Sequence, residues 1–135
     1  MARTFTILAA AFGLLAVLAG TFGAHGLRQR LSADDLAIWE TAARYQMYHA
    51  LALLGVAWAC ERFRSRAIVA AGWLFAAGIL IFGGSLYKLA ASELIFGQRQ
   101  PWLGMIAPIG GLCLIAGWIC LLVGAIRWDR KPQPG

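Results

Sequence analysis

Seven polar side chains lie in or beside the long apolar stretches of this 135-residue chain and are its first candidates for chemistry: His25, Tyr45, Gln46, His49, Ser85, Tyr87 and Lys88. Polar groups in such stretches cost free energy, so they usually bind one another or mark a functional site. Two interpretations are open. Either the histidines are neutral and hold helices together through hydrogen bonds, which we favour, or the cluster is a ligand, haem or quinol site.

No catalytic or metal-binding pattern accompanies these residues. The sequence has no nucleophile with a neighbouring base, no phosphate-binding glycine loop, and no third metal ligand at helical spacing from either histidine. Cys60, Cys113 and Cys120 form no CxxC pair and are typical of small buried side chains. We therefore predict a chain that is not an enzyme, with no catalytic residue, no metal site and no cofactor.

The composition places these residues in a membrane. Hydrophobic residues make up 61% of the chain and charged residues 13%, and the mean hydropathy is +0.70, whereas soluble chains are roughly half apolar and about a quarter charged. At about 20 residues per span, the length accommodates roughly four spans. The sequence predicts an all-α integral membrane protein, a single domain over 1–135 folded as a four-transmembrane-helix antiparallel bundle, with spans at about 5–26, 42–60, 67–91 and 108–128.

Local signals indicate where helices begin. Ser32 followed three residues later by Asp35 is a capping pattern, so the second helix is expected to start ahead of its span. Pro108 suits the first turn of the fourth helix. Residues 102–107 are then expected at the interface or in a distorted turn.

Two of the polar residues carry specific expectations. The first two helices are joined by a short connection and should be antiparallel neighbours, so we expect His25 to pack against the start of the second helix, near Tyr45, Gln46 or His49. Lys88 is expected to extend its ammonium group to the membrane surface.

The charge distribution predicts the orientation. The net charge is +6, but the basic residues stand at the ends of apolar segments, where they meet lipid headgroups rather than nucleic acid. With four spans, the side holding both termini carries seven basic and two acidic residues, a net +5, and the other side five basic and four acidic residues, a net +1. The positive-inside rule places both termini in the cytoplasm of a bacterial inner membrane. All seven polar residues then fall in the outer half of the membrane.

Small residues repeat every seven positions in the first and last segments: Ala9, Ala16 and Gly23, then Gly110, Gly117 and Gly124. Such faces let helices approach closely, either inside one bundle or between copies. The predicted partners are the lipid bilayer and, through these faces, a homo-oligomer or larger membrane complex, without nucleic acid.

Four strings of residues carry a resemblance to a known family: FGAHGL at 22–27, YQMYHAL at 45–51, GSLY at 84–87 and PIGGL at 108–112. They resemble domain-of-unknown-function family 423, small bacterial inner-membrane proteins related to transmembrane protein 256 of animals. Ala107 and Gly83 depart from the family pattern, which often has Thr and Ser there. The resemblance implies a four-helix inner-membrane protein and brings no activity or cofactor.

The leading functional hypothesis is a non-enzymatic structural, assembly or accessory component of the inner membrane. The alternative is an oligomeric transporter or channel for a small solute, which would require a pore between subunits because the inner halves of the segments are almost wholly apolar.

Overall fold

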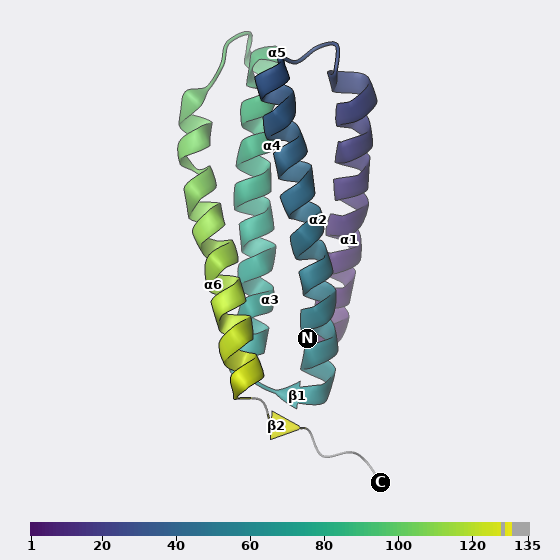
Figure 1. The fold of residues 1–135 in the computed structure, drawn as a ribbon, viewed down its shortest axis with the longest axis vertical. Coiled ribbons are helices and arrows are strands. Elements are labelled where there is room, and N and C mark those ends of the chain that lie inside the picture. The colour runs from purple at the N-terminus through teal and green to yellow at the C-terminus, as the bar shows by residue number, and fades with distance from the viewer. Residues whose placement is uncertain (128, 131–135) are drawn as a thin grey trace.

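The chain folds into long helical rods joined by short connections (Figure 1). The computed structural model describes residues 1–127, 129 and 130, so residue 128, the last of the predicted fourth span, lies outside the described residues. The first rod is α1 (Ala2–Phe22) continued by the π-helical segment η1 (Gly23–Leu27), and the second is α2 (Ala33–Arg62). The third rod consists of α3 (Arg66–Gly78), the π-helical η2 (Ile79–Gly83) and α4 (Gly84–Ala90). The fourth rod consists of the 3-10 turn η3 (Pro101–Met105) and α6 (Ala107–Ile126). Outside the rods lie β1 (Phe63–Arg64), α5 (Ser92–Phe96) and β2 (Asp129–Arg130).

Successive rods run in opposite directions (Figure 1). The N-terminus, β1 and β2 lie at one end of the bundle, here called the terminal end, and the 28–32 and 97–100 connections lie at the other, the loop end. β1 and β2 pair antiparallel, with Phe63 opposite Arg130. α1 packs mainly on α2, and α3 on α6, while α2 also packs on α3, η2 and α4. The second rod therefore joins the two helical hairpins.

Three segments of the described chain are long and apolar enough to cross a membrane: Ala2–Leu27, Arg66–Ala90 and Pro101–Ile126. They establish the predicted all-α membrane class. α2 is not among them, because Arg44, Gln46 and His49 interrupt its apolar stretch. Gln46 and His49 are buried in the bundle, so the polarity of α2 is directed toward its helical neighbours rather than outward.

The predicted helix starts are confirmed. The Ser32 side chain caps α2, with Oγ accepting a hydrogen bond from the Asp35 amide at 3.1 Å. Pro108 lies in the first turn of α6. The distorted turn expected ahead of it is the 3-10 segment η3.

Two features of the fold were not predicted, one in the rods and one in a connection. The first and third rods each contain a π-helical segment, where one wider turn changes the face that the following residues present. The connection after the third rod contains α5, which ends at Gly97 in the left-handed conformation, with φ of 70°. A glycine suits this position because other residues rarely adopt a positive φ.

The heptad-spaced small residues of α6 form contacts inside the chain. A Cβ atom on Gly110 would lie 2.3 Å from the backbone nitrogen of Phe82, and one on Gly117 would lie 2.6 Å from the Phe75 ring. Ala9, Ala16 and Gly23 are buried as well. These faces are occupied by neighbouring helices of the same bundle, so they give no support to an oligomer.

The centre of the bundle is closely filled by apolar side chains. Phe5, Leu53, Val56, Ile68 and Phe75 are at most 1% exposed and belong to one core cluster. Large apolar side chains of the outer faces of α1 and α6, among them Leu14, Leu18, Leu112, Ile119 and Leu122, are more than half exposed. An apolar exterior around an apolar core is the arrangement of a bundle solvated by lipid.

Candidate functional site

Gln46 joins three helical rods near the middle of the bundle. Its side chain is buried on α2, where Nε2 donates to the carbonyl oxygen of Phe12 in α1 at 2.8 Å. Its Oε1 accepts a hydrogen bond from the Tyr87 hydroxyl of α4 at 3.1 Å. Both ends of the amide are thus used in contacts between helices, which satisfies a group that would otherwise be costly to bury.

His49, one helical turn further along α2, joins the second rod to the fourth. Its Nδ1 lies 2.8 Å from the Tyr45 carbonyl oxygen, and its Nε2 lies 3.1 Å from Trp118 Nε1 in α6. An indole N–H can only donate, so Nε2 must be the acceptor and Nδ1 must carry the proton. The imidazole is therefore neutral, and both of its nitrogens are engaged.

We call Gln46, His49, Tyr87 and Trp118 the polar core. It lies deeper than the sequence suggested. Gln46 is beside Phe12, near the centre of α1, and His49 contacts the rings of Phe75 and Trp118. For Gln46 and His49 the outer-half placement is not what the bundle shows, because α2 begins at Ala33 and reaches the middle of the bundle by Gln46.

The expected contact of His25 with the second helix is also wrong. His25 is exposed on η1, and Gly23, two residues earlier, faces Trp39 instead. Trp39 Nε1 donates to the Ala19 carbonyl oxygen at 2.8 Å, and its ring lies 4.7 Å from that of Tyr87, centre to centre. An imidazole at the end of a helix can reach water or headgroups, so it needs no protein partner. The large indole fills the space between the first and second rods.

The remaining predicted residues lie outside the polar core. Tyr45 is 42% exposed, and its ring packs beside His49 and Phe82. Ser85 is buried but donates to the Phe82 carbonyl oxygen of its own rod, at 2.9 Å. Lys88 is exposed.

A second polar group, which the sequence interpretation missed, lies at the loop end. Asp35 is 4% exposed; its Oδ1 lies 3.0 Å from Arg99 Nη1, and its Oδ2 accepts a hydrogen bond from Ser32. Ser92 is fully buried, donating to the Leu89 carbonyl oxygen and accepting from the Gln100 amide. The Asp35–Arg99 ion pair ties the start of α2 to the 97–100 connection, and Ser92 ties the same connection to the end of the third rod. The available sequence signal was an aspartate at a helix start together with an arginine in the other connection on the same side.

The arrangement offers little for metal or haem chemistry. Among the residues that the structure describes, no group of three or more His, Cys, Asp or Glu side chains could hold a metal ion. His25 and His49 lie at different depths, and His49 has no free nitrogen with which to ligate iron. What the polar core does chemically is to hydrogen-bond four helical rods to one another.

Comparisons with known proteins agree on one family. The family model described as "Protein of unknown function (DUF423)" matches residues 19–111. The UPF0382 membrane protein YwdK of Bacillus subtilis is 40% identical over 127 residues, covering 93% of this chain and 98% of that protein. The UPF0382 membrane protein SSP2132 of Staphylococcus saprophyticus is 42% identical over 125 residues, covering 93% and 98%.

A third relative carries a location in its name. The UPF0382 inner membrane protein YgdD of Escherichia coli K12 is 40% identical over 129 residues, covering 96% of this chain and 94% of that protein. No solved structure matches the chain. Matches along nearly the whole length, together with three helical segments able to cross a membrane, identify the chain as an integral protein of the bacterial inner membrane and a member of the DUF423 family.

Proposed function

We propose that all four rods cross the inner membrane, with both termini in the cytoplasm. α2 supplies the support for the fourth span. It packs along α1 on one side and along α3 and α4 on the other. These helices belong to the first and third rods, which are both candidate spans. Its 30 residues extend for about 45 Å, more than the roughly 30 Å hydrocarbon layer requires. A helix of this length, packed between two spans that both run antiparallel to it, would have to cross with them.

The orientation rests on charge. Five arginines with described side chains belong to segments at the terminal end, Arg3, Arg62, Arg64, Arg66 and Arg127, with Glu61 as their acidic counterpart there. Arg62 lies over the Trp58 ring, with Cζ 5.2 Å from the ring centre. Arginine beside tryptophan is typical of the membrane surface, and an excess of arginine is typical of the cytoplasmic side.

We further propose that the protein is a non-catalytic component of the inner membrane that acts by association with another membrane protein. The observation that carries this proposal is the saturation of the polar core. The Gln46 amide and both His49 nitrogens already bind other groups of the bundle. A catalytic base or nucleophile needs a free lone pair facing its substrate. The polar groups therefore serve the fold, and the outer faces are left for partners.

The alternative of a small-solute transporter would need a path between copies of the chain. Phe5, Leu53 and Phe75 fill the centre of a single bundle and are fully buried, which opposes a path within it.

Gln46→Leu combined with Tyr87→Phe tests the non-catalytic role. The double variant removes both partners of the Gln46–Tyr87 hydrogen bond at nearly constant shape, a change that is often close to neutral for stability, while the Phe12 carbonyl oxygen loses the bond from Gln46. We expect it to fold and to retain the same stoichiometric protein partner as the unmodified chain. The measurement is quantitative mass spectrometry of complexes excised from native membranes with a polymer that needs no detergent.

The control for that experiment is the single Gln46→Leu change, which leaves the Tyr87 hydroxyl without its acceptor and should cost more stability than the double change. A folded double variant that loses the partner would assign the polar core a direct role. A monomeric, partnerless particle from the unmodified chain would remove the association proposal.

A further inference from the structure

A large pocket lies at the terminal end, away from the polar core. It has a volume of about 810 Å³ and is open, between the start of α1, the end of α2, β1 and the start of α3. This volume falls within the roughly 300–1,000 Å³ typical of small-molecule sites, far more than a single inorganic anion fills. Its apolar walls include Met1 and Val69.

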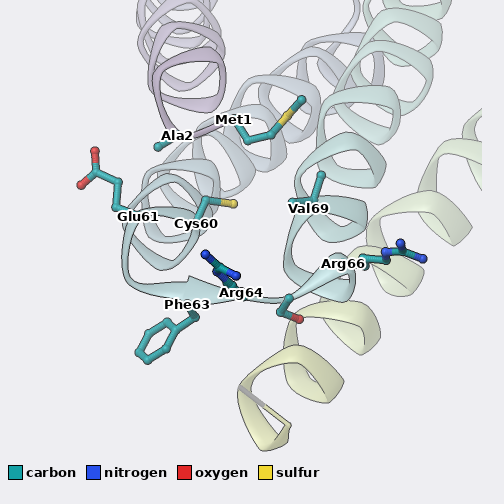
Figure 2. A pocket seen from close by; sticks show the side chains of 9 residues that line it. Met1, Ala2, Cys60, Glu61, Phe63, Arg64, Arg66 and Val69 are labelled. Carbon is teal, nitrogen blue, oxygen red and sulfur yellow. The ribbon is translucent and has the colours of Figure 1, made fainter. Parts of the chain in front are cut away.

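One basic side chain is directed into this pocket. Figure 2 shows the Arg64 guanidinium turned toward the middle of the pocket, whereas Glu61 and Arg66 point outward. Arg64 is exposed. The start of α3, a 13-residue helix, also borders the pocket at Ser65, and its first amides add partial positive charge. The pocket thus combines a positive centre with apolar walls.

We propose that this pocket binds the headgroup phosphate of an anionic glycerophospholipid from the same leaflet. A guanidinium binds phosphate oxygens in a bidentate manner. A phospholipid also supplies apolar glycerol esters and acyl chains for the walls beside Met1 and Val69, which a soluble phosphate would leave uncovered. The four-span arrangement of the proposed function places the pocket at headgroup level, but binding to detergent-solubilised protein can be measured without knowing the topology.

Native mass spectrometry of the delipidated full-length protein tests this site. With phosphatidylglycerol and phosphatidylcholine added in equal amounts, the unmodified chain should retain phosphatidylglycerol in preference. Arg64→Gln should weaken phosphatidylglycerol binding by about fivefold, the effect of one arginine near anionic lipid. Arg62→Gln is the matched control, because it removes the same charge two residues away, from a side chain that lies over Trp58 and does not line the pocket. Because this side chain does not line the pocket, its loss should weaken phosphatidylglycerol binding clearly less than Arg64→Gln does.

Two further measurements separate the sources of phosphate and guard against misfolding. A large excess of inorganic phosphate at matched ionic strength should leave the lipid bound, and phosphatidylglycerol should raise the unfolding temperature of the unmodified chain more than phosphatidylcholine does. Equal losses for Arg64→Gln and Arg62→Gln would show adsorption to a charged surface and overturn the site. Displacement of the lipid by phosphate, or no preference in the unmodified chain, would overturn it as well.

Discussion

Replacing Gly110 by alanine is expected to destabilise the bundle by about 2–3 kcal/mol, the upper part of the range for overpacked cores. The added Cβ would lie 2.3 Å from the Phe82 nitrogen and 2.7 Å from the Phe82 Cα. Both atoms belong to the backbone of η2 and cannot rotate away as a side chain can. α6 would therefore have to move off the third rod. Unfolding monitored by circular dichroism in a detergent series gives the free energy.

Gly111→Ala is the matched control for this prediction. A Cβ there would lie 3.9 Å from Phe82 Cδ2, an ordinary contact. Since alanine favours a helix interior over glycine by up to about 1 kcal/mol, this variant should be unchanged or slightly more stable. Similar losses for the two adjacent variants would mean that α6 does not approach η2 as closely as described.

Replacing Trp39 by alanine should cost about 2–4 kcal/mol, somewhat below the value for a fully buried tryptophan because the side chain is only part-buried. The change removes the hydrogen bond to the Ala19 carbonyl oxygen and the ring contacts with Phe22 and Tyr87. It also leaves a space beside Gly23, whose missing side chain makes room for the indole. The first rod should then separate more readily from the second, as measured by proteolysis of the 28–32 connection together with the unfolding free energy.

His25→Ala serves as the comparison, because His25 is exposed on the same turn as Gly23. Its effect should stay within about 0.5 kcal/mol, as for other exposed positions. A loss larger than that of Trp39→Ala would restore the imidazole as the group that closes this end.

Much of the fold could be predicted from the sequence because it depends on strong local patterns. Apolar runs of about 20 residues indicated the rods, and Ser32 and Pro108 marked helix starts through their own backbone chemistry. The π-helical segments could not be predicted in this way. Their wider turns carry no residue signature in the chain, and η2 lies where α2 and α6 both pack on the third rod.

The candidate site could be predicted in its composition but not in its geometry. Gln46, His49 and Tyr87 stood out as polar residues in apolar surroundings, and the structure brings them to the middle of the bundle. Their depth depends on how far α1 and α2 slide along each other, which no local pattern specifies. Trp39 and Trp118 were missed as hydrogen-bonding partners because an indole satisfies apolar patterns while its N–H still requires an acceptor.

The side of the membrane on which each connection lies is the most direct test of the four-span account. Single cysteines replace Gln29, Glu61 or Gln98 in a background where Cys60, Cys113 and Cys120 are alanine, and an impermeant maleimide is applied to intact spheroplasts and to lysed membranes. All three positions are exposed, with residues 29 and 98 at the loop end and residue 61 at the terminal end. With four spans, positions 29 and 98 should be labelled in intact spheroplasts and position 61 only after lysis. Labelling of 29 and 61 from the same side would mean that α2 does not cross the membrane and would contradict the account.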